Sequence, residues 1–218
     1  MRKWILALGV FVALAVAVGF FTNRYASVPL ASNSVPSTAA PIIQKGTVSG
    51  PVTILGMELG RALALPPCKE TKISSGGSVI LFDPKVSCAY AVDTKNKQRW
   101  AIFIANDKRP NYFKSVEVVI LDGKISEIDV VTNGIKSQDA VLADLINKFG
   151  EPASQTTRIA QNRFGATFEI ASASWKLEKA GAIFFSGATE NIDAGYVNVI
   201  TDKAWKWSAG QKPQSPHL

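Results

Sequence analysis

The stretch 112–152 constrains the fold more than any other, because it predicts a β-hairpin followed directly by an amphipathic helix. β-Branched residues alternate along 116–121 and recur along 125–130, with Asp122-Gly123 between the two runs. An Asp-Gly pair suits a two-residue hairpin turn, because both central positions of that turn need a positive φ. We therefore expect two neighbouring antiparallel strands here.

The residues that follow predict a helix over 137–150. Ser137 is a candidate N-cap, and Asp139 lies in the first turn, where the helix dipole favours an acid. Gly150 suits a left-handed position after the helix, and Pro152 blocks its continuation. Apolar residues recur on one face at helical spacing: Val141, Leu142, Leu145, Ile146 and Phe149. Hairpin and helix together are a fold nucleus and not a chemical motif.

Short apolar runs between turn residues predict further strands. They lie at 79–82, 88–92, 100–105, 167–177, 182–185 and 196–201. A hydrophobic content of 47% supports a packed core. The expected class is α+β, with a mainly antiparallel sheet packed by one or two helices behind an N-terminal transmembrane helix.

The N-terminus predicts export. Residues 4–21 carry no charge and would extend about 27 Å as a helix, close to the hydrocarbon thickness of a bilayer. Arg2 and Lys3 keep the N-terminus cytoplasmic. We expect a single-pass anchor in a bacterial inner membrane with the remainder in the periplasm. The alternative is a cleaved signal peptide and a periplasmic or secreted domain.

Composition divides the chain into four parts. Residues 1–22 are the anchor or signal peptide, and the Ser-, Pro- and Ala-rich 23–50 is a flexible linker. Residues 51–208 form the exported domain, and 209–218 form a disordered tail. Cys68 and Cys88 are the only cysteines, and in an oxidising compartment such a pair predicts a disulfide.

The formal charge of +7 is concentrated, because positions 85–114 hold seven Lys and Arg against two Asp. This cluster indicates either a solvated hairpin or a surface for anionic envelope components such as lipid headgroups or cell-wall polymer. The candidate contacts are Lys95, Lys97, Arg99, Lys108 and Arg109. Trp205 and Trp207 would face the same side of a strand and form a candidate aromatic partner site. Nucleic acid is not expected in this compartment.

The sequence offers little for catalysis. The single histidine, His217, lies in the expected tail, so no Ser-His-Asp or Cys-His arrangement is available. No phosphate loop or zinc-binding spacing occurs, and we expect no metal and no cofactor. Glu127 and Asp129 share a strand face, where two acids are usually solvated. We therefore expect no enzyme, with a carboxylate-dependent hydrolase as the least favoured alternative.

The sequence also carries one family likeness. The hairpin turn at 122–125 and the helix end at 145–152, Leu-Ile-Asn-Lys-Phe-Gly-Glu-Pro, resemble a pattern in small exported bacterial α+β domains. The group is the β-lactamase-inhibitor-like domains, which include a small lipoprotein of the outer-membrane assembly machinery. The resemblance implies protein binding or scaffolding in the envelope without catalysis. This chain lacks the lipid-bearing cysteine of such lipoproteins.

These expectations combine into a membrane-tethered periplasmic binding or scaffold protein. Its membrane contact would run through residues 4–21, and its partner would be another envelope protein. The alternative function is direct binding of anionic envelope components through the basic cluster.

Overall fold

The computed structural model describes residues 45–72, 77–92, 96–161 and 165–210. The predicted anchor, most of the predicted linker, Lys95 and residues 211–218 lie outside these ranges. Within them, no helix has the length and apolar character needed to cross a membrane.

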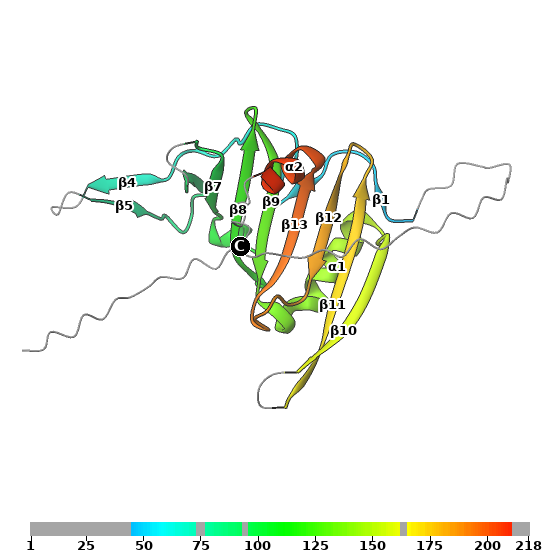
Figure 1. The fold of residues 1–218 in the computed structure, drawn as a ribbon. Helices are drawn as coiled ribbons and strands as arrows, with labels where there is room; N and C mark the ends of the chain where they lie inside the picture. Colours follow the sequence, from blue (N-terminus) through cyan, green and yellow to red (C-terminus); the bar gives the residue numbers. More distant parts are fainter. Residues whose placement is uncertain (1–44, 73–76, 93–95, 162–164, 211–218) are drawn as a thin grey trace, which may run out of the picture. The chain divides into compact units, whose positions relative to one another are not determined.

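A mixed, mostly antiparallel sheet of nine strands is the centre of the described structure (Figure 1). Its order is β1-β11-β12-β13-β9-β8-β7-β6, and β10 also pairs with β11. The bounds are β1 Thr47–Val48, β6 Cys88–Ala91, β7 Arg99–Phe103, β8 Phe113–Leu121, β9 Lys124–Thr132, β10 Ser154–Gln161, β11 Thr167–Leu177, β12 Gly181–Ser186 and β13 Gly195–Thr201. Two small hairpins, β2–β3 (Thr53–Ile54, Met57–Glu58) and β4–β5 (Lys69–Lys72, Ser78–Leu81), lie outside it.

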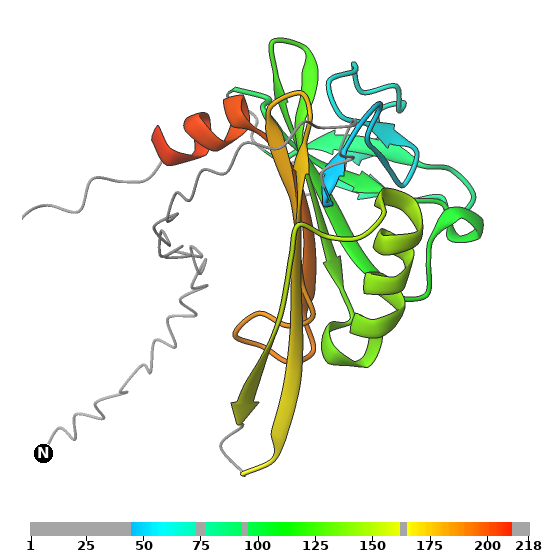
Figure 2. The same cartoon turned by 90° about the vertical axis from the view of Figure 1, so that its right-hand side faces the viewer.

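The helical elements are the 3₁₀ turns η1 (Asn106–Lys108) and η2 (Gly134–Ser137) and the helices α1 (Gln138–Phe149) and α2 (Asp202–Gly210). The two α-helices pack on opposite faces of the sheet (Figure 2). We call these the α1 face and the α2 face. The predicted α+β class with an antiparallel sheet and helices is confirmed.

The predicted hairpin is strands β8 and β9, which pair from Phe113–Thr132 to Leu121–Lys124. Asp122 and Gly123 both have positive φ, 50° and 72°, as the two-residue turn requires. The predicted helix is α1, with its apolar residues against the sheet. Ser137 precedes it, but its hydroxyl donates to the Gly134 carbonyl at 3.1 Å and does not cap the helix.

The main core lies between α1 and the sheet. Val141 and Leu145 of α1 pack with alternate residues of the central strands, including Val118, Ile128 and Val199. Trp175 on β11 is fully buried, and its Nε1 donates to the Gly150 carbonyl at 2.8 Å. This bond joins the end of α1 to the sheet.

The chain end differs from the sequence-based expectation. Residues 202–210 form α2 and not a strand, so Trp205 and Trp207 do not share a strand face. Helical residues that are two positions apart in the sequence differ by about 200° around the helix axis, so the two tryptophans point to different sides. Trp207 packs against a second core of Val119, Leu121, Ile200 and Ala204, whereas Trp205 is 45% exposed.

Three strands have no apolar signature in the sequence. β10 is exposed along nearly its whole length, β4 is Lys-Glu-Thr-Lys, and β1 has two residues. Each owes its extended conformation to a partner, since β10 and β1 pair with β11 and β4 pairs with β5. The sheet therefore starts at Thr47, before the expected domain boundary at residue 51, and α2 continues to Gly210.

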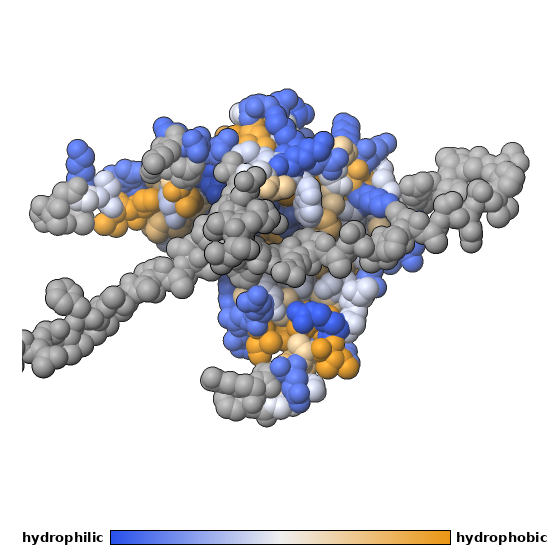
Figure 3. Space-filling model, viewed as in Figure 1, coloured by the Kyte–Doolittle hydropathy of each residue, from blue (hydrophilic) through white to orange (hydrophobic). Residues whose placement is uncertain are grey.

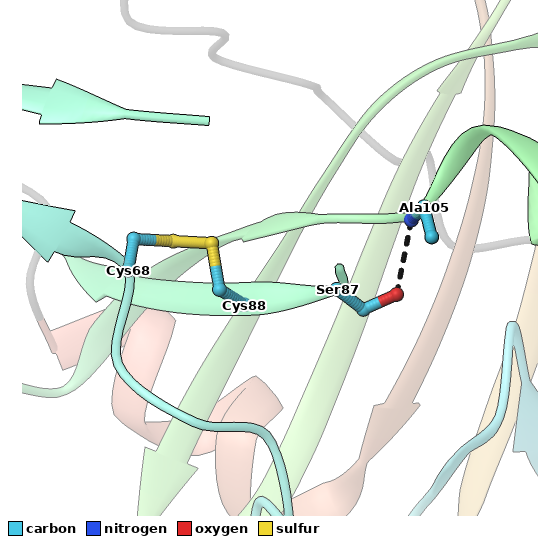
Figure 4. The surroundings of a disulfide bond; sticks show 4 residues. All are labelled: Cys68, Ser87, Cys88 and Ala105. Carbon is cyan, nitrogen blue, oxygen red and sulfur yellow. Dashed lines mark hydrogen bonds between the residues drawn. A yellow bond between two sulfur atoms is a disulfide. The ribbon is translucent and has the colours of Figure 1, made fainter. Parts of the chain in front are cut away.

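The predicted disulfide is present, and Cys68 and Cys88 join the segment before β4 to β6 (Figure 4). Two backbone bonds reinforce it, from Cys68 N to Ala89 O and from Ala89 N to Pro66 O, both 2.9 Å. Beside it, the Ala105 amide donates to the Ser87 hydroxyl at 3.0 Å. The β4–β5 hairpin is thus tied to the edge of the sheet.

Replacing both cysteines with serine should lower the free energy of unfolding by about 3 kcal/mol, because the open loop gains entropy in the unfolded chain. Urea denaturation of the full chain measures this loss. A reductant should destabilise the native protein to the same extent and leave the double variant unchanged. Equal stability of the native protein with and without reductant would contradict the expectation.

Candidate functional site

The α2 face brings together charged and polar side chains from four strands. In one row across the sheet, Glu117, Asp129 and Asn198 lie directly opposite one another on β8, β9 and β13. In the next row, Val119, Glu127 and Ile200 occupy the same strands, and Arg99 of β7 lies opposite Val119. We call Glu127, Asp129 and Asn198 the carboxyl cluster.

Asn198 connects the two acids. Its Nδ2 donates to Oε1 of Glu127 at 2.8 Å and also to Oδ1 of Asp129. Glu127 is only 7% exposed, because it lies between Val119 and Ile200, which pack with Ala204 of α2. Its Oε2 is buried and has no hydrogen-bond partner among the described residues. The expectation that both acids are solvated is therefore wrong for Glu127.

This environment favours a proton on the cluster. Burial, followed by the nearby Asp129 carboxyl, raises the pKa of Glu127 to about 7. Burial also raises the pKa of Asp129, whereas Asn198 lowers it. Because two adjacent carboxylates repel in a low-dielectric site, the pair holds a proton at pH values where solvated acids are ionised.

Arg99 interacts electrostatically with both acids of this cluster. It lowers the pKa of both acids, forms an ion pair with Glu117 at 3.7 Å, and its guanidinium carbon lies 5.9 Å from the centre of the Trp207 ring. Chemically, the arrangement can hold and release a proton. Among the described residues no group of three or more His, Cys, Asp or Glu is placed to hold a metal ion.

A second feature is an exposed apolar surface near the β4–β5 hairpin. Val79 and Leu81 alternate on β5, and Phe82 and Val86 follow in the turn towards β6. Their exposed fractions are 44%, 50%, 47% and 47%, respectively. We call these four residues the 79–86 surface. Figure 3 shows hydrophobic residues gathered beside this hairpin, at the left of the view.

The 79–86 surface has an aromatic base and a basic border. Phe82 stacks on Phe103 of β7, and the Tyr90 ring centre lies 6.5 Å from that of Phe82. Lys69 is directly opposite Leu81 in the β4–β5 pair, and Lys85 adjoins Val86 in sequence. The periodic pattern at 79–82 predicted a strand, but its exposure could not be read from the sequence, because it depends on where the hairpin projects.

The structure places the predicted basic contacts before and after β7. Lys97 precedes β7 and Arg99 is its first residue, whereas Lys108 and Arg109 lie in and after η1, beyond its end. Arg99 is paired with Glu117, and Lys95 lies outside the described residues. The structure therefore does not bring the four described residues together at one point.

An open cleft of about 570 Å³ lies near the start of α1. It is lined by Asn111, Tyr112, Lys114, Asn133, Lys136, Ser137, Ala140 and Asp193. Both lysines have partners, since Lys114 donates to the Asp193 carbonyl and Lys136 lies 3.5 Å from its carboxylate. Burial and a hydrogen bond to Asp144 raise the pKa of Tyr112 to about 12, so its hydroxyl stays protonated. Tyr112, Lys114 and Lys136 of the cleft are therefore engaged in contacts within the protein.

Comparison of the chain with protein-family models, with curated proteins and with solved structures gave no match. Fold and surface are thus the observations that bear on function, and the likeness to β-lactamase-inhibitor-like domains stays a prediction.

Proposed function

We propose that this protein is a membrane-tethered binding module of the bacterial periplasm, which binds another envelope protein through the 79–86 surface. The observation that carries the proposal is the grouping of exposed apolar residues on β5 and on the turn that follows it. Of the seven large hydrophobic residues exposed in the described structure, five lie between Val79 and Val92. Grouped exposed apolar residues with a polar border are typical of interaction sites.

The chemistry of this surface specifies the partner. Apolar side chains at its centre need a partner with an apolar or aromatic patch, and the bordering Lys69 and Lys85 favour acidic groups around that patch. The disulfide keeps the hairpin attached to the sheet, so less entropy is lost on binding. The predicted anchor at 4–21 would raise the effective concentration of the module for neighbouring membrane proteins.

A photo-crosslinking residue at position 81 of the full-length protein, in the native bacterium, tests the proposal. We expect one dominant adduct with a different protein from position 81, and no adduct with a different protein from position 159, which is also exposed but lies on β10. In the protein with the crosslinking residue at position 81, the further substitution Val79→Gln should abolish the adduct. It should not change the unfolding midpoint, because Val79 is not in the core.

Equal adducts with a different protein from positions 81 and 159 would contradict a specific surface. Salt-sensitive binding of the purified protein to phosphatidylglycerol vesicles, with no protein adduct, would instead support the alternative of an anionic envelope ligand.

The carboxyl cluster favours a second candidate, a carboxylate-dependent hydrolase. Two adjacent acids with raised pKa values are typical of general acid–base pairs. Against this, Asn198 bonds to both acids, and Glu127 is buried between residues that contact α2. Hydrolysis of cell-wall fragments by the native protein, lost in both Glu127→Gln and Asp129→Asn, would support this candidate.

A further inference from the structure

The two edges of the large sheet differ, because one is covered by another segment of the described chain and the other is not. At β6, the segment 66–68 bonds to Ala89 and covers the edge. At the other end, β10 pairs with β11 over eight consecutive positions without a bulge, and no described strand pairs with its outer side. Its residues are exposed except for Ala160, which is partly buried, and Ile159 is 74% exposed.

This edge lacks the usual protection against pairing. Natural edge strands carry lysines, prolines, bulges or inward charges that prevent another strand from adding. β10 is Ser-Gln-Thr-Thr-Arg-Ile-Ala-Gln, with one charge and no proline. That charge is Arg158, whose Nη2 lies 3.5 Å from the Thr189 carbonyl.

We propose that β10 pairs antiparallel with β10 of a second copy of this chain, which joins the two sheets in a symmetric dimer. The strand is complementary to itself in one register. If the two-fold axis is perpendicular to the sheet, the α1 face of one copy continues into the α1 face of the other. Residues whose side chains are on the same face of the sheet must then lie opposite one another. Two registers meet this condition and pair seven residues of each strand, one centred on Thr157 and the other on Arg158.

Charge decides between these registers. Centring on Arg158 would place two Arg158 residues directly opposite each other, and like charges in that position are destabilising. Centring on Thr157 places Thr157 opposite its own copy and Arg158 opposite Thr156. Threonine pairs across strands are favourable, and no like charges meet. The dimer therefore has Thr157 on its axis.

Cysteine cross-linking of the full-length protein in native membranes tests this register. Residues directly opposite in an antiparallel pair have Cα atoms about 4.5 to 5.5 Å apart, within the range that a disulfide spans. Thr157→Cys should convert most of the monomer into a disulfide-linked dimer under mild oxidation. Thr156→Cys is the matched control, because its two copies would lie about 8 Å apart, beyond disulfide reach.

A second measurement avoids oxidation. The native full-length chain in detergent should show the protein mass of a dimer by light scattering, and Thr157→Lys should show half that mass, because two lysines would meet on the axis. A monomeric native chain would overturn the proposal. So would dimers from Thr156→Cys that equal those from Thr157→Cys, or a disulfide that joins the Thr157→Cys variant to a different protein.

Discussion

Replacing Trp175 with alanine should lower the free energy of unfolding by about 3 to 5 kcal/mol, as expected for a large aromatic residue removed from a core. Trp175 is fully buried, so the substitution leaves a cavity between β11 and α1. It also removes the donor to the Gly150 carbonyl, the hydrogen bond that joins the end of α1 to the sheet. Urea denaturation followed by far-UV circular dichroism measures the loss.

Two variants separate these contributions. Trp175→Phe keeps much of the ring volume and loses the indole donor, so it should lower the free energy of unfolding less than Trp175→Ala does. Trp205→Ala removes a tryptophan that is 45% exposed and should cost less than Trp175→Ala. Equal losses for the two alanine variants would contradict the larger contribution expected of the buried Trp175.

The carboxyl cluster should make the protein less stable as pH rises from about 4.5 to about 7. The ordinary pKa of a glutamic acid is 4.5, and in the folded protein the pKa of Glu127 is raised to about 7. Below pH 4.5 the group is protonated in both states and its contribution is fully present. Above that pH the unfolded chain releases the proton first, so stability falls by about 1.4 kcal/mol per pH unit until the folded pKa is passed. The raised pKa of Asp129 acts in the same direction.

Glu127→Gln tests this expectation because glutamine does not titrate. The variant should be more stable than the native protein above pH 7, and the difference should shrink towards pH 4.5. Glu117→Gln is the matched control on the same face, where the Glu117 side chain is 45% exposed. Urea midpoints measured from pH 4 to 8 give the three profiles. A native profile parallel to that of Glu127→Gln would contradict the raised pKa.

Local sequence was sufficient for the central hairpin and α1. Asp122-Gly123 needs no distant contact to turn the chain, and the apolar residues of α1 repeat at helical spacing within twelve residues. The disulfide could also be predicted, because the chain has one pair of cysteines and the N-terminus indicates export. In each case the signal lies in neighbouring residues or in composition.

Local sequence was insufficient at α2 and at Glu127. Trp205-Lys206-Trp207 alternates as a strand would, but the segment is part of a helix. In this helix Ala204 and Trp207 pack against Val119 and Ile200, which lie far away in the sequence or on another element. Glu127 and Asp129 alternate as solvated acids would. Their burial depends on α2 and on Asn198, about seventy residues later in the chain.

The α+β class, the hairpin–helix unit and the disulfide follow from the sequence, because periodicity, turn chemistry and cysteine number express short-range preferences. Three other properties follow only from the packing of the folded chain: which acids share a buried site, which apolar residues of the β4–β5 hairpin and the following turn stay exposed, and that polar β10 forms an open edge. These properties depend on what lies opposite each side chain or strand, and residues distant in the sequence supply those neighbours.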